Sequence, residues 1–169
     1  LMAGQYPETT SVTGNGDHLA EDCVTLPRHF RDHGYLAARV GKIYHMAIPA
    51  DVVQGTPGGD HPPSWDVTHD IAAMETMTPG DHEDFTEPDA AATYPAAREE
   101  WHQAMESGTP YEMPSSVRGN YAVVEVPDGD ADLLPDTMAT DEAIRILQEH
   151  EAGDPPLFLA VGFVRPHFP

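Results

Sequence analysis

The chain has 169 residues, and 40% of them are hydrophobic, enough for a domain with a packed core rather than a disordered tail. It carries 29 acidic and 8 basic residues, so its formal net charge is -21, and such a surface repels nucleic acid and anionic membranes. No run of about 18 apolar residues occurs, so we expect no membrane insertion.

The composition also resembles that of proteins from high-salt environments, because it is acidic and poor in lysine. Lys42 is the only lysine, and the other basic residues are arginines. Salt at 1 M reduces the Debye length to about 3 Å, which screens the repulsion between crowded carboxylates. We therefore predict a halophilic character for this protein.

The first predicted elements form a helix, a tight turn and a strand. Thr25 to Gly34 has apolar residues near helical spacing, and Gly34 is well placed to end the helix. Tyr35 to Val40 is a short apolar strand that ends at Gly41. This order of elements is typical of an α/β sheet.

The middle of the chain has little periodicity. From Gln54 to Pro88 it is rich in Gly, Pro, Asp and His, and we predict one long surface loop over about residues 54–90. Tyr94 to Ser107 is predicted to form a helix around Trp101 and Met105.

The last third has the clearest pattern. A helix is predicted from Asp136 to His150, where Asp136 and Thr137 offer capping oxygens and three residues form an apolar face, Ala143, Ile144 and Leu147. The run from Leu157 to Phe163 then predicts a strand buried on both faces, as parallel sheets require.

Both predicted strands are followed by polar residues that include histidine. Lys42 and His45 follow the first strand, and His167, flanked by two prolines, follows the second. Ligand sites in open α/β sheets lie beyond the carboxyl ends of the strands. A lysine is a compact charge suited to a tetrahedral anion, and a nearby histidine can donate to that anion or move a proton. A surface lysine beside an incidental histidine is the alternative.

The tripeptide Gly-Asp-His occurs three times, starting at Gly16, Gly59 and Gly80. Asp and His are good metal ligands, so a non-catalytic acidic module that binds a divalent metal is one interpretation. The spacings are irregular and Gly-Asp is common in turns, so we favour turns.

Several blocks of the chain resemble the sulfatase family. LMAGQYPETT at the start resembles the segment after the nucleophile signature C-x-P-S-R-x-x-L-x-x-G. Val24 to His45 is similar to the stretch with the active-site lysine and histidine, and its K-x-x-H spacing resembles the iduronate-2-sulfatase branch. PSWD at Pro63, LPDTMATDEAI at Leu134 and LFLAVGFVRPHFP at Leu157 resemble the same branch, so the resemblance covers essentially the whole chain.

The resemblance implies a partial alkaline-phosphatase-like α/β fold, mainly a parallel sheet flanked by helices, and hydrolysis of a sulfated small molecule or saccharide. It implies that Lys42 holds a sulfate oxygen and stabilises the transition state. His45 would hydrogen-bond to the hydroxyl groups of the nucleophile. His167 would contact the sulfate and assist the leaving oxygen. In such enzymes the nucleophile is formylglycine, made from a cysteine, beside a divalent cation that is usually calcium.

The sequence departs from the family pattern in what it lacks. The nucleophile would lie upstream of Leu1, and Cys23 cannot replace it, because Val-Thr-Leu-Pro follows it rather than the signature. The Ca²⁺ ligands are expected outside this chain as well. We therefore expect residues 1–169 to be one partial catalytic domain, truncated at both ends and inactive alone. The resemblance alone points to an extracytoplasmic location.

Overall fold

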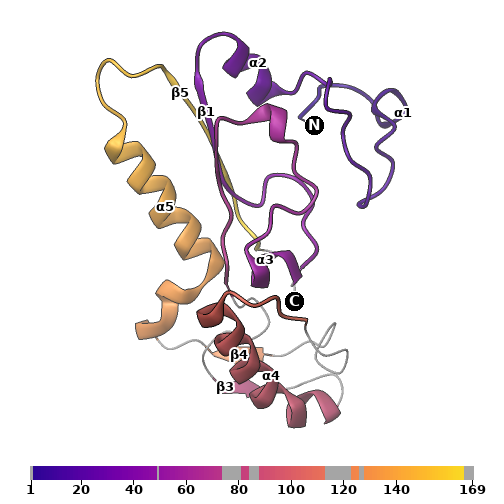
Figure 1. The fold of residues 1–169 in the computed structure, drawn as a ribbon, viewed down its shortest axis with the longest axis vertical. Helices are drawn as coiled ribbons and strands as arrows, with labels where there is room; N and C mark the ends of the chain where they lie inside the picture. Colours follow the sequence, from indigo (N-terminus) through magenta and orange to yellow (C-terminus); the bar gives the residue numbers. More distant parts are fainter. Residues whose placement is uncertain are drawn as a thin grey trace. The chain divides into compact units, whose positions relative to one another are not determined.

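A computed structural model describes residues 2–48, 50–73, 81–83, 88–112, 123–125 and 128–165 (Figure 1). The chain forms two compact units. The first contains Leu1–Met46, Pro57–Asp70 and Ala139–Phe163, and the second contains Ala47–Thr56, Ile71–Met138 and Val164–Pro169. In the described ranges, no helix is long and apolar enough to cross a membrane.

The first unit is built on a three-stranded sheet. The central strand β1 (Leu36–Gly41) pairs with β2 (Val67–His69) on one side and β5 (Leu157–Gly162) on the other. Both pairings are parallel, and β1 and β5 stay in register from Leu36 opposite Leu157 to Gly41 opposite Gly162. Five of the six residues of β1 are buried. The predicted parallel sheet of an α/β fold is therefore confirmed.

Helix α2 (Leu26–Asp32) packs against this sheet, and its boundaries follow from its sequence. The Thr25 hydroxyl accepts a hydrogen bond from the Arg28 N–H at 3.3 Å and caps the first turn. Gly34 has φ +84°, a left-handed conformation that glycine adopts without strain, and it ends the helix. The ring of Phe30 stacks on that of Phe158 in β5, with the ring centroids 4.8 Å apart. A short helix α1 (Pro7–Thr10) precedes α2 in this unit.

Two expectations about buried apolar residues are wrong. Strand β5 was predicted to be buried on both faces, but none of its residues reaches full burial. The reason is its place in the sheet, because among the described strands only β1 pairs with it. In helix α5 (Pro135–Glu149) the predicted apolar face is buried only at Ala143, while Ile144 and Leu147 are 45% and 58% exposed.

The predicted long loop over residues 54–90 is also wrong for part of its length. It contains a 3₁₀ turn η1 (Pro62–Ser64) and strand β2, and His61 and Trp65 are buried. The carboxylate of Asp66 accepts from the Ala37 N–H at 2.9 Å, and the Asp66 N–H donates to the Ala37 carbonyl at 2.8 Å. These contacts with β1 are distant in sequence, so local periodicity carries no sign of them.

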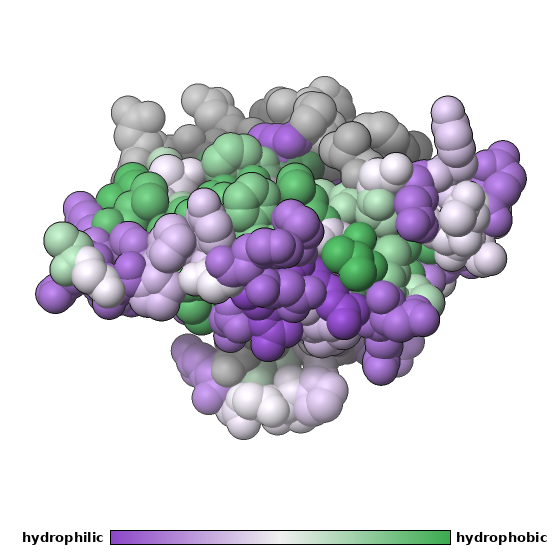
Figure 2. Space-filling model, turned by 90° about the horizontal axis from the view of Figure 1, so that it is seen from above, coloured by the Kyte–Doolittle hydropathy of each residue, from purple (hydrophilic) through white to green (hydrophobic). Residues whose placement is uncertain are grey.

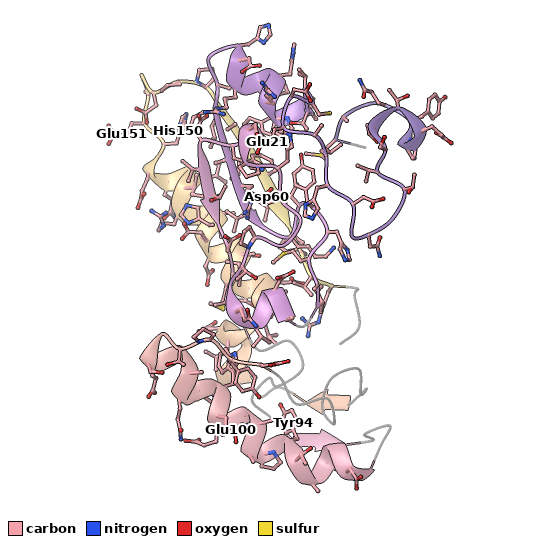
Figure 3. All side chains as sticks on the ribbon, turned by 45° about the vertical axis from the view of Figure 1, so that its right-hand side comes forward. Glu21, Asp60, Tyr94, Glu100, His150 and Glu151 are labelled. Carbon is pink, nitrogen blue, oxygen red and sulfur yellow. The ribbon has the colours of Figure 1, made fainter. Side chains whose placement is uncertain are left out.

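The second unit has a core of its own around helix α4 (Pro88–Ser107). Its buried cluster consists of Val53, Tyr94, Ala97, Trp101, Ala104 and Tyr111. The indole N–H of Trp101 donates to the Val53 carbonyl at 3.1 Å, which ties α4 to helix α3 (Ala50–Gln54). Figure 3 shows Tyr94 and Glu100 on α4. The helix predicted over 94–107 is confirmed, and it begins earlier, at Pro88.

Three further elements belong to the second unit. The strands β3 (Asp81–Glu83) and β4 (Val123–Glu125) pair antiparallel. A 3₁₀ helix η2 covers Asp128–Leu133. Whether residues 1–169 form a single domain stays a prediction.

Candidate functional site

The candidate site begins where β1 ends, at a contact between two glycines. Gly41 has φ +69°, and a Cβ atom built there would lie 2.4 Å from the Gly162 carbonyl oxygen. A Cβ atom at Gly162 would lie 1.9 Å from the Lys42 carbonyl oxygen. The Lys42 N–H donates to the Gly162 carbonyl at 3.0 Å. Only glycine fits at both positions, and their contact holds the Lys42 backbone at the carboxyl end of β5.

Lys42 differs from four arginines of the chain in its surroundings. Its side chain is half-buried, and within the described ranges no carboxylate lies within ion-pair distance of it. Four arginines each lie within 4.0 Å of at least one carboxylate, namely Arg28, Arg31, Arg39 and Arg145. A cation without a carboxylate partner at the carboxyl end of a parallel strand is able to bind an anionic ligand.

His45 lies in the segment that follows Lys42, and its side chain is exposed. Its backbone carbonyl accepts from the Gly59 N–H at 2.8 Å, and Gly59 also lies close to the ring of His18. Tyr44 lies between Lys42 and His45 in the chain, and its hydroxyl is 3.4 Å from the Ser64 hydroxyl. Burial raises the pKa of the Tyr44 phenol, so it stays protonated at neutral pH. The segment therefore turns one residue inward and presents His45 to solvent.

A buried hydrogen-bond network anchors Tyr44. The Ser64 hydroxyl lies 2.6 Å from the Thr25 hydroxyl and 2.7 Å from His61 Nδ1. His61 Nε2 lies 3.0 Å from the Ala20 carbonyl, which can only accept, so Nε2 carries the hydrogen. In the neutral ring, Nδ1 then accepts from Ser64. The residues of the PSWD block therefore hold the segment around Tyr44 in place.

The third predicted site residue, His167, lies outside the described residues. The structure describes the chain up to Arg165, and Asp136 binds its last two described residues. Asp136 Oδ1 accepts from the Val164 N–H at 2.7 Å, and Asp136 Oδ2 accepts from the Arg165 N–H at 3.2 Å. This contact joins the LPDT block to the block that contains His167.

Sequence reasoning missed a buried ion-pair cluster on β1. Arg39 is 2% exposed, and its guanidinium lies 2.8 Å from Asp60 Oδ2 and 2.8 Å from Asp70 Oδ1. The Asp60 contact is a hydrogen bond, whereas the Arg39 N–H does not point at Asp70 Oδ1, so that contact is an ion pair alone. An arginine inside an apolar strand was the signal that sequence reasoning could have used, because a buried charge requires a partner.

Two of the three Gly-Asp-His tripeptides have structural roles. The Asp17 carboxylate accepts from the N–H groups of Thr13 and Gly14 at 2.8 and 2.7 Å and closes a turn. Asp60 pairs with Arg39 and accepts from the Trp65 indole at 3.1 Å. The third tripeptide begins at Gly80, and the side chains of Asp81 and His82 lie outside the part of the chain that the structure describes. Two of the candidate carboxylates are thus already engaged within the protein.

The described residues do not fit a calcium or other metal site. Among them there is no group of three or more His, Cys, Asp or Glu side chains that could hold a metal ion. The free thiol of Cys23 is half-buried.

The surface in view in Figure 2 alternates between hydrophilic and hydrophobic groups. The apolar side chains that are more than half exposed in the described part of the first unit are Tyr6, Val24, Leu26, Leu147 and Phe163. The acidic composition is therefore accompanied by a considerable apolar surface.

Comparisons with known proteins find similarity to iduronate 2-sulfatases. The chain is 26% identical over 172 residues to iduronate 2-sulfatase from Mus musculus and to iduronate 2-sulfatase from Homo sapiens. Each match covers 100% of this chain, whereas the chain spans 26% of the length of either relative. No family model matches the chain. The similarity indicates a sulfatase-type relationship.

Proposed function

We propose that this chain forms part of a sulfatase-type hydrolase in which Lys42 binds the sulfate group of the substrate. The observation that carries the proposal is the position of Lys42, half-buried just beyond the carboxyl end of the central parallel strand, with no carboxylate near it among the described residues. The similarity to iduronate 2-sulfatases along the whole chain supports the same assignment.

The chemistry follows from the charge of a sulfate ester. As the ester bond breaks, negative charge builds up on the sulfate oxygens and on the leaving oxygen. The Lys42 ammonium group would stabilise the sulfate oxygens. His45, exposed in the segment after β1, would hydrogen-bond to the hydroxyl groups of the nucleophile, and His167 would assist the leaving oxygen.

Two further components complete the proposal, and neither belongs to the described residues. The nucleophile would be a formylglycine made from a cysteine upstream of Leu1. A calcium ion would be held by residues outside this chain. Residues 1–169 alone are therefore expected to hydrolyse no sulfate ester and to bind calcium no better than about millimolar.

The alternative, an acidic module that binds metal through Gly-Asp-His turns, has less support. Asp17 and Asp60 already accept hydrogen bonds from the protein, so they are poorly placed as ligands. A calcium and zinc titration of residues 1–169 separates the two proposals, because only the module would bind metal tightly.

The direct test is hydrolysis of 4-nitrophenyl sulfate and 4-nitrophenyl phosphate by the full-length protein. We expect turnover of the sulfate and a reduction of at least about 100-fold in His45→Ala, because general acid–base groups contribute about that much. His150→Ala is the matched control, since His150 lies at the C-terminal end of α5 and has no proposed role (Figure 3). Phosphate turnover without sulfate turnover would contradict the proposal.

A further inference from the structure

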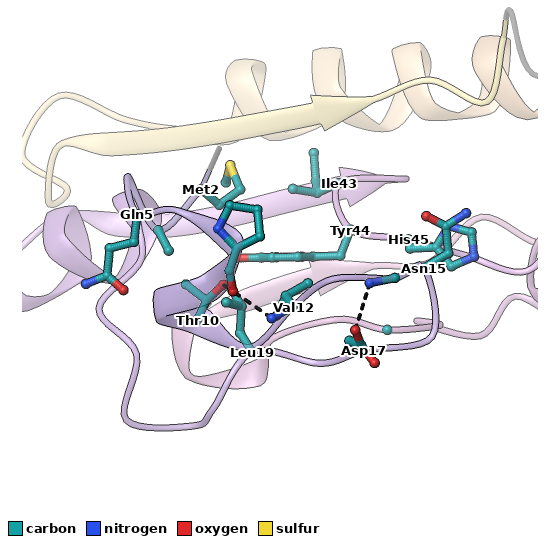
Figure 4. Close-up of a pocket in the computed structure, with 14 residues that line it drawn as sticks. Met2, Gln5, Thr10, Val12, Asn15, Asp17, Leu19, Ile43, Tyr44 and His45 are labelled. Atoms are coloured by element: carbon teal, nitrogen blue, oxygen red, sulfur yellow. Dashed lines mark hydrogen bonds between the residues drawn. The ribbon is translucent and has the colours of Figure 1, made fainter.

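A pocket in the first unit has a volume of about 330 Å³ (Figure 4). Its wall comes from three parts of the chain: the N-terminal segment from Met2 to Leu19, the segment 43–45 that follows Lys42, and Gly59. In the view of Figure 4, Gln5 lies at one end of the pocket, and Asn15 and His45 lie at the other. The volume lies at the lower end of the range for small-molecule sites.

The pocket adjoins the proposed sulfate-binding residues. His45 is part of its wall, and so is Ile43, the residue directly after Lys42. A sulfate ester held by Lys42 and His45 would therefore have its organic part beside this pocket.

The chemistry of the wall disfavours a charged ligand group. Among the described residues no lysine or arginine belongs to it, and Met2, Val12, Leu19 and Ile43 make much of it apolar. Its acidic residue is Asp17, which accepts hydrogen bonds from the N–H groups of Thr13 and Gly14 and from the Thr13 hydroxyl. These bonds lower the pKa of Asp17, so its carboxylate is charged at neutral pH. An anionic group in the pocket would meet no lysine or arginine among the described residues and would lie near this carboxylate.

We propose that the pocket takes the uncharged organic part of a sulfate ester, such as a neutral sugar ring or an aryl group, and discriminates against uronates and other esters with a second anionic group. This inference rests on the proposed sulfatase function and adds its substrate class. The similar mouse and human proteins are named for a uronate, so the preference inferred here differs from the one in their name. The charged Asp17 carboxylate and the lack of lysine and arginine in the described wall supply the discrimination.

The test compares two matched substrates on the full-length protein. One is the 4-methylumbelliferyl glycoside of glucose 2-sulfate, and the other is the same glycoside of glucuronate 2-sulfate, which differs only by a carboxylate in place of CH₂OH. We expect kcat/KM to be at least about 10-fold higher for the neutral ester. Equal rates, or a preference for the uronate, would overturn the inference and leave the proposed function intact. If the protein hydrolysed neither glycoside and also failed to hydrolyse 4-nitrophenyl sulfate, the proposed function and the inference would both be contradicted.

A variant makes the same test independent of folding. Thr10 belongs to the pocket wall and is only partly buried, so Thr10→Lys adds a cation there. We expect the ratio of kcat/KM for the uronate to that for the neutral ester to rise by at least about 10-fold. Val24→Lys is the control, because Val24 is 55% exposed and lies outside the pocket wall. Both rates are measured on one sample, so a loss of folded protein cancels. An unchanged ratio in Thr10→Lys would contradict the inference.

Discussion

Strand β1 and the segment after it each carry a basic residue, and the two residues have opposite surroundings. Arg39 lies inside the strand, 2% exposed, with Asp60 and Asp70 both 2.8 Å away. Lys42, three residues later, is half-buried and has no carboxylate partner among the described residues. A buried cation without a partner costs several kcal/mol, so Arg39 is paired for stability. The difference indicates that Arg39 belongs to the scaffold and that Lys42 is available to a ligand.

The largest expected effect on stability comes from removing the buried Arg39. Arg39→Ala leaves Asp60 and Asp70 without their cation and should lower the free energy of unfolding by about 3–5 kcal/mol. Urea unfolding of the full-length protein measures it. Arg145→Ala is the control, because its ion pairs with Glu142 and Glu149 are exposed and should contribute little to stability. If both variants lost the same stability, the Arg39 cluster would not be the buried element described above.

The next effect concerns the chain that follows β5. Glycines close the end of β1, whereas two hydrogen bonds from Val164 and Arg165 to the Asp136 carboxylate fix the chain after β5. Asp136→Ala should lower the free energy of unfolding by about 1.5–3 kcal/mol, because the acceptor is charged. Asp136→Asn keeps one carbonyl oxygen and should lose less. Chemical unfolding of both variants checks this order, and equal losses would mean that the carbonyl oxygen kept in Asp136→Asn contributes nothing, which would contradict the described contact.

A broader effect follows from the net charge of -21. Salt at 1 M screens repulsion beyond about 3 Å, so the melting temperature should rise by several degrees from low to molar potassium chloride. The activity of the full-length protein should rise as well, because global repulsion of a sulfate ester weakens. Thermal melts and initial rates across a potassium chloride series measure both. A melting temperature that is flat or falls with salt would rule out a high-salt adaptation.

The smallest expected effect is at the exposed turn closed by Asp17. Hydrogen bonds from the N–H groups of Thr13 and Gly14 lower the pKa of Asp17 from its usual value of 3.8. Because the folded pKa is below the unfolded one, the turn is fully stabilised above the unfolded value and loses this stability as the pH falls through the folded value. Carbon-13 NMR titration of the carboxyl group measures the pKa directly. Thr13→Ala removes one hydrogen bond and should raise it partway toward 3.8, and a wild-type pKa at or above that value would contradict the described turn.

Local signals in the sequence predicted the elements that depend on neighbouring residues. Helix α2 ends before Gly34, which adopts a left-handed conformation, and this glycine was the predicted end of the helix. The parallel pairing of β1 with β5 agrees with the α/β expectation. The two predicted strands thus lie side by side, with Lys42 at the end of one of them.

The remaining features depend on contacts between residues distant in sequence. Strand β2 has three residues and joins the sheet through Asp66, so no apolar period marks it. Residues of α5 and β5 are exposed where no other part of the described chain packs on them. The apolar periodicity of the sequence carries no information about this packing. Asp136 was predicted for its capping oxygens, whereas the structure shows its carboxylate bound to Val164 and Arg165. The roles of Lys42, His45 and His167 stay predictions.

The most direct test of the central claim is the activity of Lys42→Ala in the full-length protein on 4-nitrophenyl sulfate, measured together with its unfolding free energy. We predict that kcat/KM falls at least about 100-fold, equivalent to about 3 kcal/mol of transition-state stabilisation, while stability stays within about 0.5 kcal/mol of wild type. In Arg39→Ala, by contrast, the main effect should be a large loss of stability. A Lys42→Ala protein that hydrolyses the ester within a few-fold of the wild-type rate would show that Lys42 does not bind the sulfate.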